Sequence, residues 1–143
     1  MTGIDDLLRA GAPLQRPLRL YLGADRRIGI TLEKRSTSGV ISAIDLTGLT
    51  WRWSALDACA TPLIDAITGD PDSPAADGEL TIPITKAQVA ALYDALGGDD
   101  CDRYRICRWQ LQIIDDHPDP SLTALVYAGR LWVGLAEVET EDD

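Results

Sequence analysis

The chain has 143 residues, 45% of them hydrophobic, and carries 13 Lys and Arg against 23 Asp and Glu, a formal net charge of −10. This length fits one domain that buries about two-thirds of its unfolded surface. The acidic balance argues against a nucleic-acid partner, because phosphate neutralisation needs clustered Lys and Arg, and the lack of a run of about 18 apolar residues argues against a membrane-spanning helix.

The first fifteen residues are predicted to form an N-terminal arm. They lack a basic segment followed by an apolar one, so no secretion signal is expected. Ile4, Leu7 and Leu8 make a small apolar face on one or two helical turns. A helix this short is marginal alone, so we expect the arm either to dock on a partner or to fray.

From Leu18 the hydrophobic period changes to two, which predicts two short strands around 18–22 and 28–32. Residues 44–53, IDLTGLTWRW, then enter a further strand. Trp51 and Trp53 are in phase with apolar neighbours, which favours core packing over a ligand-binding platform. The segment 68–79 has the Pro, Gly and Asp content of a loop.

One helix is well specified, over about 86–96. Thr85 and Gln88 form a T-x-x-Q capping box, and apolar residues follow at helical spacing. Trp109 and Leu111 lie on the apolar face of the next alternating strand, and 122–133 returns as another, so the two are predicted to form a hairpin. In that last strand Leu125 is expected on the same face as Leu131.

These elements predict an all-β fold, an antiparallel β-sandwich of about seven or eight strands with one short helix. We assign residues 1–15 to the arm, 16–136 to the sandwich and 137–143 to an acidic tail.

Residues that could carry out chemistry are sparse. His117 is the only histidine and lies in a Pro- and Asp-rich hairpin tip, where an exposed turn residue is favoured over a general base. Cys59, Cys101 and Cys107 form no CxxC pair and are expected to be free thiols. No catalytic residue, metal site or cofactor is therefore predicted, and whether the acidic loops bind a cation stays open.

Two aromatic residues have a separate interpretation. Trp132 is out of phase with its buried neighbours, which makes it the best candidate for an exposed partner-binding residue. Tyr104 stands where immunoglobulin-like sandwiches place a tyrosine that ties a corner with its hydroxyl, so it is assigned to the structural core with Trp51, Trp53, Trp109 and Leu111.

The order and spacing of five segments resemble a family of small tailed-phage virion proteins. The segments are RLYLGADRRIGITL (19–32), IDLTGLTWRW (44–53), GELTIPITKAQVAALYDAL (78–96), YRICRWQLQIIDD (104–116) and TALVYAGRLWV (123–133). That family has an immunoglobulin-like domain similar to the N-terminal domain of phage baseplate upper proteins. The likeness covers about residues 18–135.

The resemblance implies a non-enzymatic structural protein of the tail, baseplate or head–tail region, made in the bacterial cytoplasm and assembled in many copies with other virion proteins. The residues expected at partner contacts are Ile4, Leu7, Leu8, Arg16, Arg19, Arg26, Arg27 and Trp132, the arginines facing acidic surface on a neighbour. Two alternatives remain open at this point: a carbohydrate-binding module that uses exposed aromatics, and an acidic immunity or inhibitor protein for a basic effector.

Overall fold

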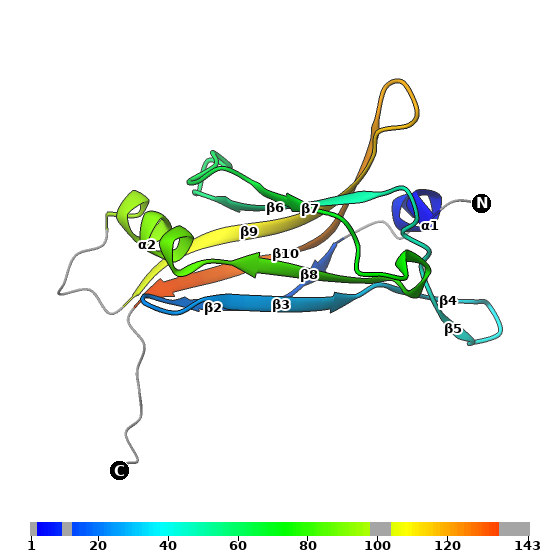
Figure 1. The fold of residues 1–143 in the computed structure, drawn as a ribbon, viewed down its shortest axis with the longest axis horizontal. Helices are drawn as coiled ribbons and strands as arrows, with labels where there is room; N and C mark the ends of the chain where they lie inside the picture. Colours follow the sequence, from blue (N-terminus) through cyan, green and yellow to red (C-terminus); the bar gives the residue numbers. More distant parts are fainter. Residues whose placement is uncertain (1–2, 10–12, 98–103, 135–143) are drawn as a thin grey trace, which may run out of the picture.

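The computed structural model describes residues 3–9, 13–97 and 104–134, and those ranges form a mostly β fold with ten strands and two α-helices (Figure 1). The expected β-rich fold is confirmed, as are the helical turns expected in the N-terminal arm, and the described residues form more strands than expected. In chain order the elements are α1 (Gly3–Arg9), β1 (Leu14–Gln15), β2 (Leu18–Tyr21), β3 (Arg26–Thr31), β4 (Glu33–Arg35), β5 (Ile41–Ala43), β6 (Thr50–Leu56), β7 (Ile67–Gly69), the 3-10 turn η1 (Ala75–Asp77), β8 (Glu79–Ile84), α2 (Lys86–Ala95), β9 (Tyr104–Asp115) and β10 (Leu122–Gly134).

One sheet dominates the fold, with the strand order β1, β10, β9, β6, β7 and with β2 also paired to β10. β10 is antiparallel to β9 but parallel to β1 and β2. The expectation of a purely antiparallel arrangement is therefore wrong at this edge. Alternation along a strand reports which side chains share a face, and it carries no information on strand direction when most of the chain separates the two partners.

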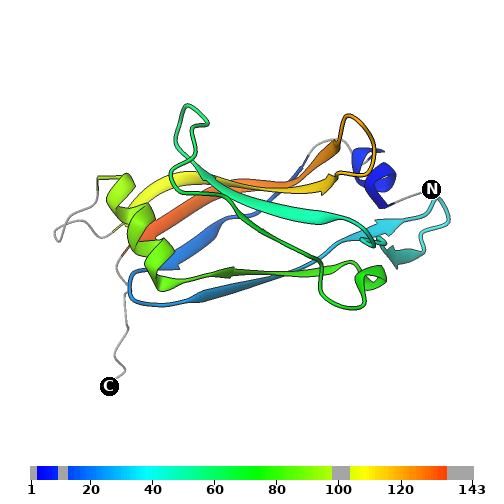
Figure 2. The ribbon, with the colours of Figure 1, turned by 45° about the horizontal axis from the view of Figure 1, so that its top comes forward.

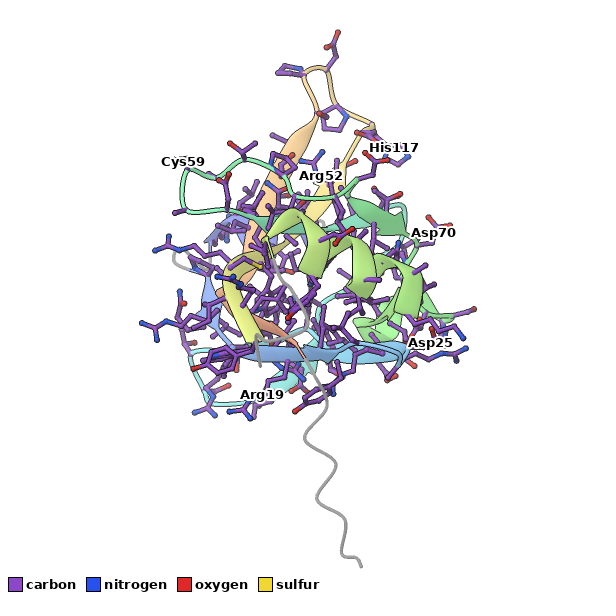
Figure 3. All side chains as sticks on the ribbon, turned by 90° about the vertical axis from the view of Figure 1, so that its left-hand side faces the viewer. Arg19, Asp25, Arg52, Cys59, Asp70 and His117 are labelled. Carbon is purple, nitrogen blue, oxygen red and sulfur yellow. The ribbon has the colours of Figure 1, made fainter. Side chains whose placement is uncertain are left out.

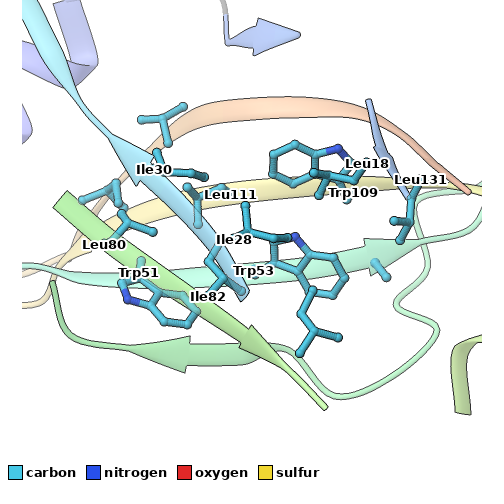
Figure 4. Close-up of a cluster of buried hydrophobic side chains, with 14 of the residues drawn as sticks. Leu18, Ile28, Ile30, Trp51, Trp53, Leu80, Ile82, Trp109, Leu111 and Leu131 are labelled. Carbon is cyan, nitrogen blue, oxygen red and sulfur yellow. The ribbon is translucent and has the colours of Figure 1, made fainter. Parts of the chain in front are cut away.

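A second layer, the antiparallel pair β3 and β8, lies across the hydrophobic core from the main sheet (Figures 1 and 4). Trp51, Trp53 and Trp109 point into this core with 3%, 0% and 1% of their surface exposed. Leu111 is fully buried beside them. The sequence-based assignment of these four residues to the core is confirmed.

The segment before β6 is a tight turn stabilised by an aspartate. Asp45 Oδ1 accepts hydrogen bonds from the backbone N–H of Thr47 at 3.0 Å and from its hydroxyl at 2.6 Å. These hydrogen bonds lower the pKa of Asp45. Gly48 follows with a φ of 77°, in the left-handed region that glycine adopts without strain. The turn thus directs the chain into β6 in the phase that buries both tryptophans.

The N-terminal helix packs against the body of the protein. Ile4 and Leu7 are only 1% and 6% exposed, so their assignment as partner contacts is wrong, while Leu8 is 44% exposed. The physical reason is that burying two aliphatic side chains on the protein itself stabilises a helix too short to persist alone. Lys34 of the projecting β4–β5 hairpin adds an ion pair with Asp6 at 2.9 Å.

Helix α2 closes one end of the molecule (Figure 2). The predicted capping box is confirmed: Thr85 Oγ1 accepts from the N–H of Gln88 at 3.2 Å, and Gln88 Oε1 accepts from the N–H of Thr85 at 2.8 Å. The carboxylate of Asp25 accepts from the N–H of Lys86 at 2.7 Å, which ties the β2–β3 connection to the helix start. Together these bonds satisfy helix N–H groups that would otherwise lack partners.

The hairpin of β9 and β10 is the longest pairing in the main sheet and confirms the prediction from residues 104–133. Its register shifts between Leu125 and Tyr127, where β10 has a bulge. The bulge turns Leu125 outward, leaving it 38% exposed, so the expectation that it shares a face with Leu131 is wrong.

Candidate partner-binding surface

The face of the main sheet that points away from the core carries an aromatic and arginine-rich surface, which we call the outer face. In the sheet register Trp132 of β10 lies between Arg19 of β2 and Ile106 of β9. Tyr21 and Tyr104 occupy the next outward row, on either side of Gly134. Tyr21, Tyr104 and Ile106 are 37%, 55% and 49% exposed, so this end of the sheet presents large apolar side chains to solvent.

Arg19 and Trp132 contact each other directly. The Arg19 guanidinium carbon lies 5.4 Å from the centre of the Trp132 ring, within the distance of a cation–π interaction. The contact is worth about 0.5–1 kcal/mol at an exposed site and limits the rotamers of both side chains. A partner that binds here therefore meets a partly ordered surface, which lowers the entropic cost of binding.

Four of the residues proposed as partner contacts meet in one place. Arg16, Arg19, Arg26 and Trp132 line a shallow depression of about 320 Å³ at the β2 edge of the sheet, together with Pro17, Leu18 and Tyr21. Arg27 is not among the lining residues and is exposed on β3, opposite Pro83 of β8. The sequence singled out these arginines as separate partner contacts, and the fold brings three of them to one indole.

The backbone of Arg16 is fixed by contacts with the sheet. The indole N–H of Trp109 donates to the Arg16 carbonyl at 2.7 Å, and the N–H of Arg16 donates to the carbonyl of Ala128 at 3.0 Å. Gly129 makes this approach possible, because a Cβ at that position would collide with the Arg16 carbonyl. The core thus determines where the β2 edge of the depression lies.

Tyr104 does not belong to the core, and its assignment there is wrong. More than half of its surface is exposed, and it faces the same side as Ile106. Pairing between β9 and β10 continues without a shift from Cys107 to Tyr104, so no bulge turns the ring inward. The tyrosine adds instead to the outer face.

Two arginines of the outer face were not singled out from the sequence. Arg108 of β9 and Arg130 of β10 are exposed and lie directly opposite each other in the register. Alternation could have shown that Arg108 faces away from Trp109, but the bulge in β10 hides the pairing with Arg130. Arg52, labelled in Figure 3, belongs to an outward position of β6, and its Nε and Nη2 donate to Gln112 Oε1 at 2.9 and 2.8 Å.

The one histidine forms a local pair in the β9–β10 turn. His117 Nδ1 lies 2.8 Å from Asp115 Oδ1, which also accepts the backbone N–H of His117 at 3.1 Å. These hydrogen bonds lower the pKa of Asp115. The imidazole side chain is 75% exposed, in agreement with the expected turn residue. The pair closes the turn, and among the described residues neither side chain forms a hydrogen bond with a hydroxyl or thiol nucleophile.

The described residues contain no group of three His, Cys, Asp or Glu side chains placed to hold a metal ion. Within the same ranges, no helix is long and apolar enough to cross a membrane. Cys59 is exposed and Cys107 buried, both as free thiols, and Cys101 lies outside the described residues, as does the acidic segment 137–143. In sequence comparisons, neither a family model nor a curated protein matches this chain.

Proposed function

We propose that this protein is a non-enzymatic structural component of a tailed-phage or prophage virion, an assembly or attachment module of the tail, baseplate or head–tail region. The observation that carries the proposal is the exposed depression in which three arginines surround Trp132. Trp, Tyr and Arg are the residue types that most often dominate the energy of protein–protein interfaces. A surface of this composition, on a rigid sheet, suits a protein that binds neighbours.

The arrangement of strands supports an immunoglobulin-like β-sandwich as the finer description of the fold. Two layers enclose one core, and the long hairpin of β9 and β10 forms the centre of the larger layer. Successive strands such as β2 and β3 belong to different sheets, as in Greek-key connections. This architecture occurs in many cell-surface domains and hosts many unrelated functions, so it is compatible with an attachment module, and the surface has to carry the argument.

Electrostatics favour a protein partner with acidic surface. The arginines around Trp132 are surface groups, so their effect on binding lies mainly in the association rate and the register of docking. A neighbour that covers the depression would also remove the indole and Tyr21 from water, and this apolar burial supplies most of the affinity.

The structure gives less support to the two alternative functions, a carbohydrate-binding module and an acidic inhibitor of a basic effector. A sugar ring stacks on a free aromatic face, whereas Arg19 already covers one face of Trp132. An inhibitor of a basic effector would present carboxylates on its binding face, whereas the outward strand positions here carry arginines. Binding on a glycan array that is abolished by Trp132→Ala would favour the carbohydrate module over a virion protein.

The direct test is the protein content of purified particles. Particles are induced from a host that carries this gene and analysed by quantitative mass spectrometry after density-gradient purification. We expect the chain to co-purify with particles in many copies and to show no hydrolase activity. Its absence from particles that contain the other capsid and tail proteins would refute the proposal.

A further inference from the structure

The outer face contains a pair of like charges that costs the isolated chain stability. Arg108 and Arg130 are direct cross-strand neighbours, and like charges in that position destabilise a sheet. In the described part of the chain neither guanidinium has an ion-pair or hydrogen-bond partner. Such a pair is expected where a binding partner supplies the opposite charge.

The two arginines flank a groove of about 460 Å³ on the outer face. Gln110 and Ala128 also line it, as do Ala58 and Ala60 of the loop after β6. Asp57 of that loop also lines the groove, but its Oδ1 already accepts the backbone N–H groups of Cys59 and Thr61 at 2.8 and 2.9 Å. The groove therefore offers arginine donors to an incoming anionic group.

The groove and the depression around Trp132 are neighbours on the outer face, because Arg130 lines the groove, Trp132 lines the depression, and the two residues are two apart on β10. Among the outward-facing strand positions of β2, β6, β9 and β10, four are arginine and none is Asp or Glu. In a chain with ten more acidic than basic residues, this face is set apart by its charge.

The matching acidic surface lies on the same molecule. The loop between β7 and β8 together with the first residue of β8, residues 70–79, contains Asp70, Asp72, Asp77 and Glu79, all exposed, and no Lys or Arg. This acidic loop lies at the end of the molecule opposite to α2, whereas α2 packs against β2 and β10, the strands that carry Arg19 and Trp132 (Figures 1 and 2). The acidic loop of one copy is therefore positioned to reach the outer face of another copy.

We infer that the outer face, from Arg108 and Arg130 to Trp132, binds the acidic loop 70–79 of a second copy of this chain, head to tail. A face-to-face dimer would place arginines against arginines, so the heterologous arrangement is favoured. Contacts of this kind close into rings or extend into filaments. The inference rests on the proposed role as a multi-copy assembly module and names the neighbour that the outer face takes.

Sedimentation velocity over a wide protein concentration range, at about 0.1 M salt, tests the inference. At that ionic strength the Debye length is about 10 Å, so repulsion between whole molecules is screened while contacting charges still attract. We expect concentration-dependent association that weakens at about 0.5 M salt. A wild-type protein that stays monomeric up to about 1 mM would overturn the inference, because the expected contact would then be weaker than about 4 kcal/mol.

Two variants separate the partners in this contact. Arg108→Glu with Arg130→Glu removes the basic side, and Asp70→Lys with Asp77→Lys removes the acidic side. Each variant is expected to be monomeric, and a mixture of the two to associate, because each retains the half that the other has lost. The loop variant carries less net negative charge than the wild type, so an effect of net charge alone would increase its association.

Arg27→Glu is the matched control, because it reverses an exposed arginine away from the outer face. It should associate as the wild type does. Far-UV circular dichroism establishes that each variant is folded. If the charge-reversed variant with Arg108→Glu and Arg130→Glu unfolds, the charge-neutral variant with Arg108→Gln and Arg130→Gln takes its place. Variants that each associate as the wild type does, or a mixture that stays monomeric, would overturn the inference.

The outcome is distinguishable from that of the proposed function. A chain that is found in particles but never self-associates would overturn the head-to-tail contact and leave the virion role in place. A chain that self-associates through these residues but is missing from particles would overturn the virion role and leave the head-to-tail contact in place.

Discussion

The three buried tryptophans differ in one respect that makes the core testable. The indole N–H groups of Trp109 and Trp51 donate to backbone carbonyls, of Arg16 at 2.7 Å and of Asp70 at 3.0 Å. The Nε1 atom of Trp53 is buried and has no hydrogen-bond partner. Substitution by phenylalanine removes the indole N–H in all three cases, and it removes a hydrogen bond in only two.

The expected magnitudes follow from burial and hydrogen bonding. Trp53 and Trp109 are almost equally buried, so the smaller ring costs each about 1 kcal/mol in lost packing. Trp109→Phe also loses a hydrogen bond and leaves the Arg16 carbonyl short of a donor, a further cost of about 2 kcal/mol. Trp53→Phe removes an unpaired N–H from the core and carries no such cost. We therefore expect Trp109→Phe to be less stable than Trp53→Phe by about 2 kcal/mol.

Urea denaturation followed by far-UV circular dichroism measures the difference, since tryptophan fluorescence changes with the substitutions themselves. For a chain of this length 2 kcal/mol corresponds to a difference of about 6–8 °C in Tm. Trp51→Phe is the internal control and should lose about as much unfolding free energy as Trp109→Phe, because it also loses a hydrogen bond. A Trp53→Phe variant as unstable as Trp109→Phe would refute the reasoning.

Three further predictions concern packing, pH and thiol reactivity. Gly129→Ala should destabilise the protein by about 2–3 kcal/mol in chemical denaturation, because its Cβ would clash with the backbone. Gly29→Ala is the control, since Gly29 also lies in a strand but has open space at its Cβ. It should change the free energy of unfolding by less than about 0.5 kcal/mol. Hydrogen bonds lower the folded-state pKa of Asp115, so the stability that this carboxylate contributes is present above its unfolded pKa of about 4 and is lost as pH falls through the folded value. Asp115→Asn should therefore reduce the loss of unfolding free energy at acidic pH. An unchanged dependence of stability on acidic pH would contradict this. Burial raises the pKa of Cys107 to about 12, so its thiol should react only when the protein unfolds. In a Cys101→Ser variant, a thiol reagent at pH 8 should modify the exposed Cys59 at once and Cys107 only on unfolding. Simultaneous modification of both would contradict the buried position of Cys107.

Local patterns predicted the features that depend on neighbouring residues. The sequence predicted the capping box at Thr85 and Gln88, and it predicted that Trp51 and Trp109 face the core. Both predictions were possible because capping and periodicity act over a few residues. The same reasoning correctly placed His117 in an exposed turn.

The errors arose where the outcome depends on distant parts of the chain. The apolar face of α1 suits docking on a neighbour as well as on the protein itself, and only the three-dimensional position of β10 shows that Ile4 and Leu7 are buried. Tyr104 was assigned inward by analogy with a corner position, although unbroken alternation back from Cys107 faces it outward.

The candidate site was predicted in part. Alternation marked Trp132 as out of phase with its buried neighbours, and exposure of arginines near position 19 follows from charge. The grouping of Arg16, Arg19 and Arg26 around the indole depends on the parallel pairing of β2 with β10, which has no local signal. The opposition of Arg108 and Arg130 depends in addition on a one-residue bulge.

The attachment role of the outer face is tested most directly by the amount of this chain in purified particles. Particles are produced with wild-type protein, with the double variant Arg19→Glu and Trp132→Ala, and with the control Arg27→Glu, each checked for folding, and the copies per particle are counted by quantitative mass spectrometry. We expect wild type and control to be incorporated equally and the double variant to be reduced at least tenfold, the effect of losing about 1.4 kcal/mol or more of binding free energy. Equal incorporation of the folded double variant would contradict the claim that this face binds a virion neighbour.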